Sequence, residues 1–177
     1  MDIFAHGLWA GAAYKGANKK REKPLKLWQA AFWGVFPDLF AFTIPFIWLF
    51  GNLLFGGMSL ADIPRPDAVE PMPQNALPIF NLASMLYSFS HSAIIFLIVF
   101  GITFLIFRRP IWELGGWFIH ILLDIPTHSY QFYPTPFLWP LSGWKFDGFS
   151  WGTPWFLILN YSAIIIVYLF LRRKKIV

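Results

Sequence analysis

The stretch FIHILLDIPTHSYQF, residues 118–132, places two imidazoles and a carboxylate inside an apolar segment. His120, Asp124 and His128 follow one another at intervals of four, so on an α-helix they begin on one face and drift by about 40° per step. Taking such groups out of water costs on the order of a few kcal/mol for each, unless a partner offsets the loss. The spacing therefore indicates a metal ion, a proton path, a haem or mutual pairing.

Pro126 lies between the last two of these side chains. It removes the hydrogen bond to the Leu122 carbonyl and should kink or end the helix there. His128 can then turn toward Asp124 or away from it, and the spacing alone does not decide between the two.

The composition is that of an integral membrane protein. Of the 177 residues, 57% are hydrophobic and 13% charged, with no cysteine, and the mean hydropathy is +0.54. A soluble domain has about 25% charged residues. We expect one membrane domain spanning residues 1–177. The basic residues stand at the ends of apolar segments rather than along one face, so no nucleic-acid partner is expected.

The apolar runs predict an all-α, polytopic bundle of about four transmembrane helices, with a short N-terminal helix that contributes to the site. The predicted spans are approximately 27–55, 78–107, 110–125 and 154–171. Four crossings would put twelve of the fourteen Lys and Arg residues on one side. The positive-inside rule makes that side cytoplasmic. We therefore predict a plasma (inner) membrane protein with its basic loops and C-terminus in the cytoplasm.

The ionisable residues inside the apolar segments share a depth. Counted at 1.5 Å per residue from the nearest basic flank, Asp38, His120 and Asp124 lie at roughly 18, 16 and 22 Å. His91 lies at roughly 25 Å and His6 at roughly 13 to 20 Å. We predict that these groups form one cluster in the outer half of the bilayer, open toward the outer face.

Imidazole nitrogens and carboxylate oxygens are ordinary ligands of zinc, and no thiolate is required. The number of candidate ligands exceeds the four that a tetrahedral ion takes, so two ions with Asp124 or Asp38 between them would use the set economically. Ser88 and Ser92 lie on the same helical stripe as His91 and could support the ligands by hydrogen bonding, or could serve helix packing instead. The candidate ligands are His6, Asp38, His91, His120, Asp124 and His128.

Five short motifs follow one another along nearly the whole chain: His6-Gly-Leu, Phe36-Pro37-Asp38, Phe89-Ser90-His91-Ser92, His120-x3-Asp124-x2-Thr127 and Leu138-Trp139-Pro140-Leu141-Ser142. Their order resembles the membrane-bound metal-dependent hydrolase family, also described as LexA-binding, inner-membrane-associated hydrolases (YdjM-like). That family looks distantly similar to zinc-dependent phospholipase C and to single-strand nucleases, which cleave phosphoesters with several zinc ions.

The resemblance implies a small helical membrane protein with a divalent metal site. Its ligands would be His6, Asp38, His91, His120 and Asp124, and His128 is added on its spacing. Thr127, in the fourth motif, joins the two serines as an expected support for the ligands.

These patterns favour an enzyme that hydrolyses a phosphoester of a lipid or lipid-linked substrate with one to three zinc ions. Asp38 or Asp124 would orient or deprotonate the attacking water. Lys145 would contact a phosphate, or would act only as an anchor at the interface. Three alternatives remain: a haem protein with His91 and His120 as axial ligands, a metal or proton transporter, and a bundle stapled by a structural metal.

Overall fold

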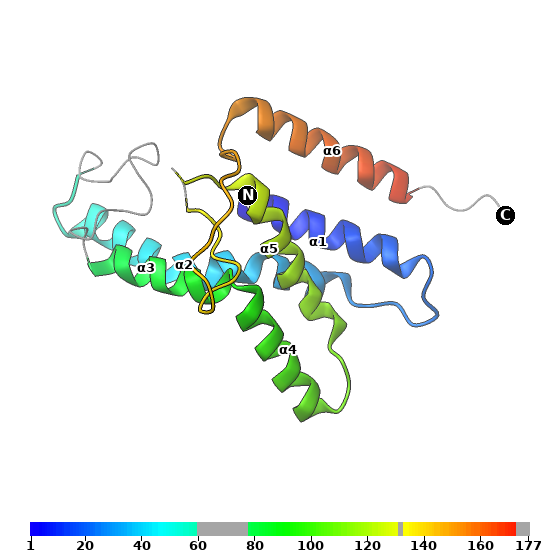
Figure 1. The fold of residues 1–177 in the computed structure, drawn as a ribbon. Coiled ribbons are helices and arrows are strands. Elements are labelled where there is room, and N and C mark those ends of the chain that lie inside the picture. The colour runs from blue at the N-terminus through cyan, green and yellow to red at the C-terminus, as the bar shows by residue number, and fades with distance from the viewer. Residues whose placement is uncertain (60–77, 131–132, 173–177) are drawn as a thin grey trace.

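The computed structural model describes residues 1–59, 78–130 and 133–172. These residues form six α-helices and one short 3₁₀ helix, and no β-strand occurs among them, which confirms the all-α prediction. In chain order the elements are α1 (Ile3–Asn18), α2 (Leu27–Phe55), α3 (Pro78–Ser90), α4 (Ala93–Phe107), η2 (Trp112–Leu114), α5 (Gly115–Thr127) and α6 (Pro154–Arg172) (Figure 1).

Two helices, α2 and α6, are long and apolar enough to cross a membrane, and α3 with α4 passes the same test as a pair bent by 60°. The structure thus gives two candidate spans, or three if the bent pair is one, and the predicted count of about four is not confirmed. The predicted third span, 110–125, differs most. Its first residues form a turn and η2, and α5 has only 13 residues, about 20 Å of helix against a hydrocarbon core of about 30 Å.

The predicted span 78–107 is broken at His91 and Ser92 rather than continuous. Ser92 has an extended backbone, and its hydroxyl accepts a hydrogen bond from the Ile95 amide at 3.2 Å, which makes it the N-cap of α4. The amide of Ala93, which α3 no longer uses, donates to the Phe137 carbonyl at 2.9 Å. Serine favours this position because its hydroxyl replaces a missing helical acceptor. The break leaves His91 at the end of a helix, inside the protein.

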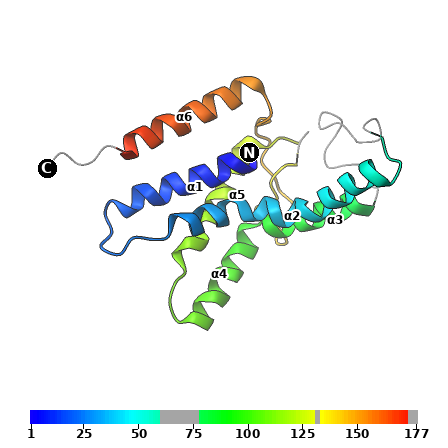
Figure 2. The ribbon, with the colours of Figure 1, turned by 180° about the vertical axis from the view of Figure 1, so that it is seen from behind.

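Helices α1 and α5 both approach the backbone of α2 closely. A Cβ on Gly34 of α2 would lie 2.7 Å from the Ala10 Cβ of α1, and a Cβ on Gly116 of α5 would lie 2.1 Å from the Ala30 carbonyl oxygen. Glycine is therefore needed at both crossings. Figures 1 and 2 show α1 running beside the first half of α2, with α5 crossing them. Side chains from three distant parts of the sequence meet at this crossing.

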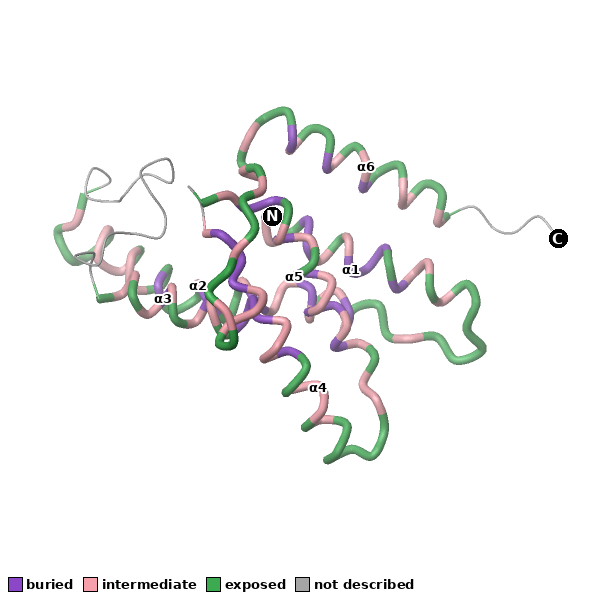
Figure 3. Tube along the Cα trace, in the orientation of Figure 1, coloured by how far each residue is buried: buried purple, intermediate pink, exposed green. Residues whose placement is uncertain are grey.

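Two apolar cores lie on either side of the crossing. Phe96, Trp117 and Ile121 belong to one, and Met1 and Phe156 to the other. Figure 3 shows the buried positions concentrated in the middle of the molecule. Helix α4 has only one buried residue and is exposed along most of its apolar length, as expected of a helix that contacts lipid.

The first turn of α1 is fixed by Asp2. Its carboxylate accepts hydrogen bonds from the amides of Phe4 and Ala5 at 3.1 and 3.0 Å, and from the Tyr161 hydroxyl of α6 at 2.8 Å. An acidic N-cap satisfies amides that have no helical acceptor. These bonds hold the start of α1 beside the C-terminal end of α5, where the chain's N-terminus lies in Figure 1.

Candidate metal centre

The structure brings the predicted ligands together in one buried cluster. Four of them, Asp38, His91, His120 and Asp124, each offer a ligand atom, and these atoms lie within 4.8 Å of one another. They come from α2, from the break between α3 and α4, and from α5. The three from His91, His120 and Asp124 are fully buried.

One half of the cluster surrounds Oδ2 of Asp124. His120 Nε2 lies 3.1 Å from this oxygen and His91 Nε2 lies 3.4 Å from it. The two nitrogens are 2.9 Å apart. Asp38 closes the group, with its Oδ1 3.5 Å from His91 Nε2 and 3.7 Å from His120 Nε2. Two nitrogens and two carboxylate oxygens are a common tetrahedral set for zinc.

The other half surrounds Oδ1 of the same carboxylate. His6 Nε2 lies 2.9 Å from this oxygen and His128 Nε2 lies 3.3 Å from it. The amino group of Met1 contacts Oδ1 and lies 2.9 Å from His128 Nε2. His128 has therefore turned toward Asp124 after Pro126, the first of the two directions that the sequence allowed. Asp124 stands between two sets of imidazoles, with one oxygen toward each.

Two of the imidazoles are oriented by main-chain carbonyls. His120 Nδ1 donates to the Gly34 carbonyl at 2.7 Å, and His128 Nδ1 donates to the Tyr133 carbonyl at 2.8 Å. A carbonyl oxygen only accepts, so each Nδ1 carries the proton and Nε2 presents its lone pair to the cluster. Metal-binding histidines are commonly fixed in this way.

His91 is held from within its own helix. Its Nδ1 lies 3.2 Å from the Tyr87 carbonyl and 2.9 Å from the Ser90 hydroxyl, and its ring stacks on the Tyr87 ring with centroids 3.7 Å apart. With Nδ1 protonated, the Nε2 atoms of His91 and His120 meet as two acceptors beside two carboxylate oxygens. Four acceptors at such distances repel one another unless a cation or an added proton lies among them.

Two buried polar atoms also indicate that a cation or a proton belongs in the cluster. Oδ2 of Asp124 and Nδ1 of His6 are buried and have no hydrogen-bond partner among the described residues. A buried carboxylate oxygen without a donor is unusual in native proteins. A divalent ion bound by Oδ2 would satisfy it, so the residues of the cluster fit a metal.

The three hydroxyls predicted to support the ligands bind elsewhere. Ser88 donates to the Ser84 carbonyl at 2.9 Å, and Thr127 donates to the Leu123 carbonyl at 2.9 Å, both within their own helices. Ser92 caps α4 and donates to the Trp139 carbonyl. The break before α4 interrupts the predicted helical stripe between His91 and Ser92.

Lys145 is not in contact with the cluster among the described residues. It lies in the segment between α5 and α6, where its carbonyl accepts a hydrogen bond from the Tyr130 hydroxyl at 2.9 Å. Partial burial lowers the pKa of Lys145. The predicted phosphate contact by this residue stays a prediction.

Several groups at the cluster were not predicted. The carbonyls of Gly34 and Tyr133 have no sequence signature, because every residue has a carbonyl. Ser90 stands next to His91 in the third motif, and this adjacency is the one sequence signal for its contact with the imidazole. The Met1 amino group reaches the cluster only because Asp2 caps α1 next to α5.

The comparisons with known proteins add no name to this site. No protein-family model matches the chain, and no match is found among curated proteins or solved structures. The family resemblance drawn from the five motifs therefore stays a prediction, and the geometry of the cluster carries the functional argument.

Proposed function

We propose that this protein is a membrane-embedded, metal-dependent hydrolase that cleaves a phosphoester of a lipid or lipid-linked substrate. One observation carries the proposal: acceptor atoms of Asp38, His91, His120 and Asp124, the last three residues fully buried, converge within 4.8 Å in a chain with candidate membrane-spanning helices. Such a group is stable only around positive charge. Zinc is the divalent ion best matched to two imidazoles and two carboxylates.

The two faces of Asp124 support a centre with more than one ion. His91, His120 and Oδ2 would hold the first ion, with Asp38 beside it. His6, His128 and Oδ1 would hold a second, in place of the Met1 amino group that contacts Oδ1. A bridging carboxylate is the usual link between paired ions in phosphoesterases. Bound zinc would supply Lewis-acid chemistry, lowering the pKa of water and stabilising charge on the phosphoryl oxygens.

The two carboxylates have different access to the surroundings. The side chain of Asp38 is 15% exposed, whereas that of Asp124 is 1% exposed. We assign Asp38 the role of orienting the attacking water and accepting its proton, because water can reach it. Asp124 would mainly hold the ions and keep the imidazoles of both halves in place.

The surroundings favour a lipid over a soluble substrate. The cluster lies beside α2 and the bent pair of α3 and α4, which are candidate spans with exposed apolar faces. A substrate that reaches this centre must pass through the hydrocarbon or lie at its edge. We place the protein in the plasma membrane with the basic ends of α1 and α6 in the cytoplasm, following the positive-inside rule.

A bis-histidine haem is not favoured by the geometry. The Nε2 atoms of His91 and His120 lie 2.9 Å apart with ring centroids at 4.8 Å, which is too close for the two rings to stand on opposite sides of a macrocycle.

Elemental analysis of the detergent-purified full chain tests the metal centre. The wild type is expected to hold at least one zinc ion per chain, and Asp124→Ala is expected to lose it. Glu22→Gln is the matched control, because this exposed carboxylate lies in the loop between α1 and α2, away from the cluster. A substoichiometric metal content that is equal in all three proteins would remove the proposal.

A substrate screen follows for the metal-loaded protein. Release of phosphate or head group from lipid phosphoesters is measured with and without a chelator. Hydrolysis that the chelator abolishes and added zinc restores is the expected result. Bound zinc without any hydrolysis across lipid classes would leave a structural metal as the better interpretation.

A further inference from the structure

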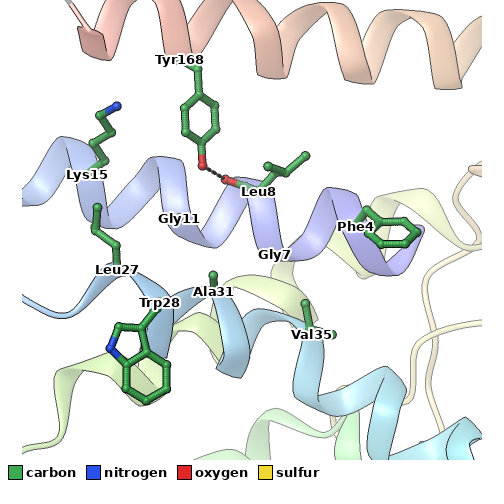
Figure 4. Close-up of a pocket in the computed structure, with 10 residues that line it drawn as sticks. All are labelled: Phe4, Gly7, Leu8, Gly11, Lys15, Leu27, Trp28, Ala31, Val35 and Tyr168. Atoms are coloured by element: carbon green, nitrogen blue, oxygen red, sulfur yellow. Dashed lines mark hydrogen bonds between the residues drawn. The ribbon is translucent and has the colours of Figure 1, made fainter.

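An apolar groove of about 510 Å³ runs between α1, α2 and α6. Figure 4 shows its lining, with the side chains of Leu27, Trp28 and Val35 on one wall and the backbone of α1 at Gly7 and Gly11 on the other. The groove follows the face of α1 opposite to His6, because its α1 residues recur at helical spacing from Phe4 to Lys15. It is therefore separate from the metal centre.

A second apolar groove, of about 390 Å³, lies on the other side of Tyr168. It is lined by Ile164, Ile165 and Leu169 of α6 and by Leu8 of α1. The hydroxyl of Tyr168 donates to the Leu8 carbonyl at 3.0 Å and so divides the two grooves. The two grooves run side by side along the junction of α1 and α6.

Each groove has one cationic residue in its lining. Lys15 belongs to the first, and its Nζ lies 5.4 Å from the centre of the Tyr168 ring. Arg172 belongs to the second, one helical turn beyond Tyr168. Neither cation forms an ion pair with a carboxylate in the part of the chain that the structure describes. Two apolar grooves thus end near one tyrosine, beside two cations that lack anionic partners there.

The membrane determines what can occupy the grooves. The first groove lies between α1, α2 and α6 and the second between α1 and α6. Of these helices, α2 and α6 are each long and apolar enough to cross a bilayer. The open sides of the grooves face hydrocarbon, where apolar chains are the surrounding solvent. An anionic group at the polar end of those chains would pair with Lys15 and Arg172, as lipid head groups do with basic residues near the membrane surface.

We propose that this junction is a binding site for one anionic phospholipid of the leaflet on the basic side. One acyl chain lies in each groove, Tyr168 stands between the chains, and the phosphate contacts Lys15 and Arg172. The site goes beyond the hydrolase proposal, since the bound lipid would tie α6 to α1 without approaching the imidazoles. The two helices also contact each other directly, for example where Trp9 donates to Asn160 at 2.8 Å.

A second copy of the chain is the other occupant to weigh, since Gly7 and Gly11 have the spacing of glycines in paired membrane helices. Both glycines already serve contacts within the chain. A Cβ on Gly7 would lie 2.9 Å from Val35 Cγ2, and a Cβ on Gly11 would lie 2.9 Å from the Tyr168 hydroxyl. The small residues are used to pack α2 and α6, so the lipid is the better match.

Native mass spectrometry of the full chain in detergent tests the site. The protein is titrated with dioleoyl phosphatidylglycerol and, separately, with dioleoyl phosphatidylcholine. The first molecule of phosphatidylglycerol to bind each chain is expected to bind more tightly than the first molecule of phosphatidylcholine. Lys15→Gln and Arg172→Gln should each lower the affinity for this first phosphatidylglycerol about fivefold, the effect of one cation near a membrane surface.

Lys20→Gln is the matched control, because it removes the same charge from an exposed position at the same end of α1, outside both grooves. Its affinity should equal that of the wild type. If Lys15→Gln and Lys20→Gln lose equal affinity for phosphatidylglycerol, the attraction is diffuse and the proposed site is wrong. Equal affinity of the wild type for the two lipids would also contradict it.

Ala31→Leu adds bulk to the first groove and tests the acyl chain. It should lower the affinity for both lipids and leave the melting temperature equal to that of the wild type. If this variant does not fold, Lys15→Gln and Arg172→Gln still test the site. A lipid-free dimer that Ala31→Leu converts to monomer would show that a second copy occupies the groove. The titration is run with and without chelator, so that loss of metal and loss of lipid are read separately.

Discussion

At the scale of single residues, Asp124 differs from its neighbours because it touches both halves of the cluster. The Nε2 atom of His120 lies 3.1 Å from Oδ2, and that of His6 lies 2.9 Å from Oδ1. Asp38 lies near the imidazoles of the Oδ2 half. Removing one side chain should therefore have graded effects, and those effects separate the roles of the two carboxylates.

Asp124→Asn is expected to lower zinc content more than Asp38→Asn, because an amide cannot bridge two ions as a carboxylate does. Asp38→Asn should keep most of the metal and lose about 10²- to 10⁴-fold in kcat, the usual contribution of a positioned base. Metal content and kcat are measured on the same preparations. Equal metal loss in both variants would show that Asp38 is only a ligand.

His120 within α5 and His128 just after it offer a second comparison at this scale. His128→Ala should remove an ion from the Oδ1 half and leave the Oδ2 half loaded, since His128 Nε2 lies 3.3 Å from Oδ1 of Asp124. His120→Ala should empty the half that includes Asp38 and His91. Native mass spectrometry counts the ions that remain. If His128→Ala keeps the full metal content of the wild type, the second half is not an ion site.

At the scale of elements, the cluster depends on how closely α5 and α1 approach α2. The residues that permit this are glycines rather than the ligands themselves. Gly116 lets α5 lie against the Ala30 carbonyl, and Gly34 both admits α1 and offers its own carbonyl to His120. Changes at these crossings should act on the metal centre without touching a ligand.

Gly116→Ala is expected to destabilise the fold by about 1 to 3 kcal/mol, the cost of overpacking, because its methyl group would meet the Ala30 carbonyl at 2.1 Å. Gly101→Ala is the control, since a Cβ there has nothing within 4 Å. Alanine favours a helix over glycine, so this variant should be neutral or more stable. The melting temperatures of the two variants are compared in detergent. Equal values would contradict the close crossing of α5 and α2.

The element scale also shows where sequence reasoning succeeded and where it could not. The boundaries of α2 and α6 follow from long apolar runs, each bounded by basic residues at one end, and the structure agrees with them. The break at Ser92 was not predicted, because the apolar run from Pro78 to Phe107 is continuous in composition. Ser92 becomes an N-cap only because the segment at Phe137 is present to accept the next amide, a contact between distant residues.

The residues of the cluster could be predicted from the sequence for a different reason. Ionisable side chains are rare in apolar segments, so His91, His120 and Asp124 stand out wherever they fall. Their orientation was not accessible, because it is set by carbonyls such as Gly34 and by the turn after Pro126. The residue types were therefore predictable, while the division of Asp124 between two sets of imidazoles required the fold.

At the scale of the whole molecule, metal and fold should be linked. The cluster joins α1, α2, α5 and the junction of α3 with α4, so an ion bound there connects most of the helices. An ion that binds only the folded protein stabilises it by about 4 kcal/mol at a free concentration 1,000 times its Kd.

Chelation is therefore expected to lower the melting temperature of the wild type, and added zinc should restore it. The melting temperature of Asp124→Ala should not respond to either treatment. Thermal unfolding is followed in detergent at one protein concentration. A wild type that melts at the same temperature with and without chelator would mean that no ion joins these helices.

The sharing of Asp124 has a consequence for how the centre fills. The two carboxylates, Asp38 and Asp124, balance the charge of one divalent ion, and the second half adds imidazoles but no further carboxylate. Two ions would leave a surplus of positive charge in a medium where charge is poorly screened. An anionic phosphoester would neutralise that surplus, so the second ion and the substrate should each raise the affinity of the protein for the other. On this basis the ion in the Oδ1 half is the more weakly bound of the two, and a bound phosphoester should strengthen its binding.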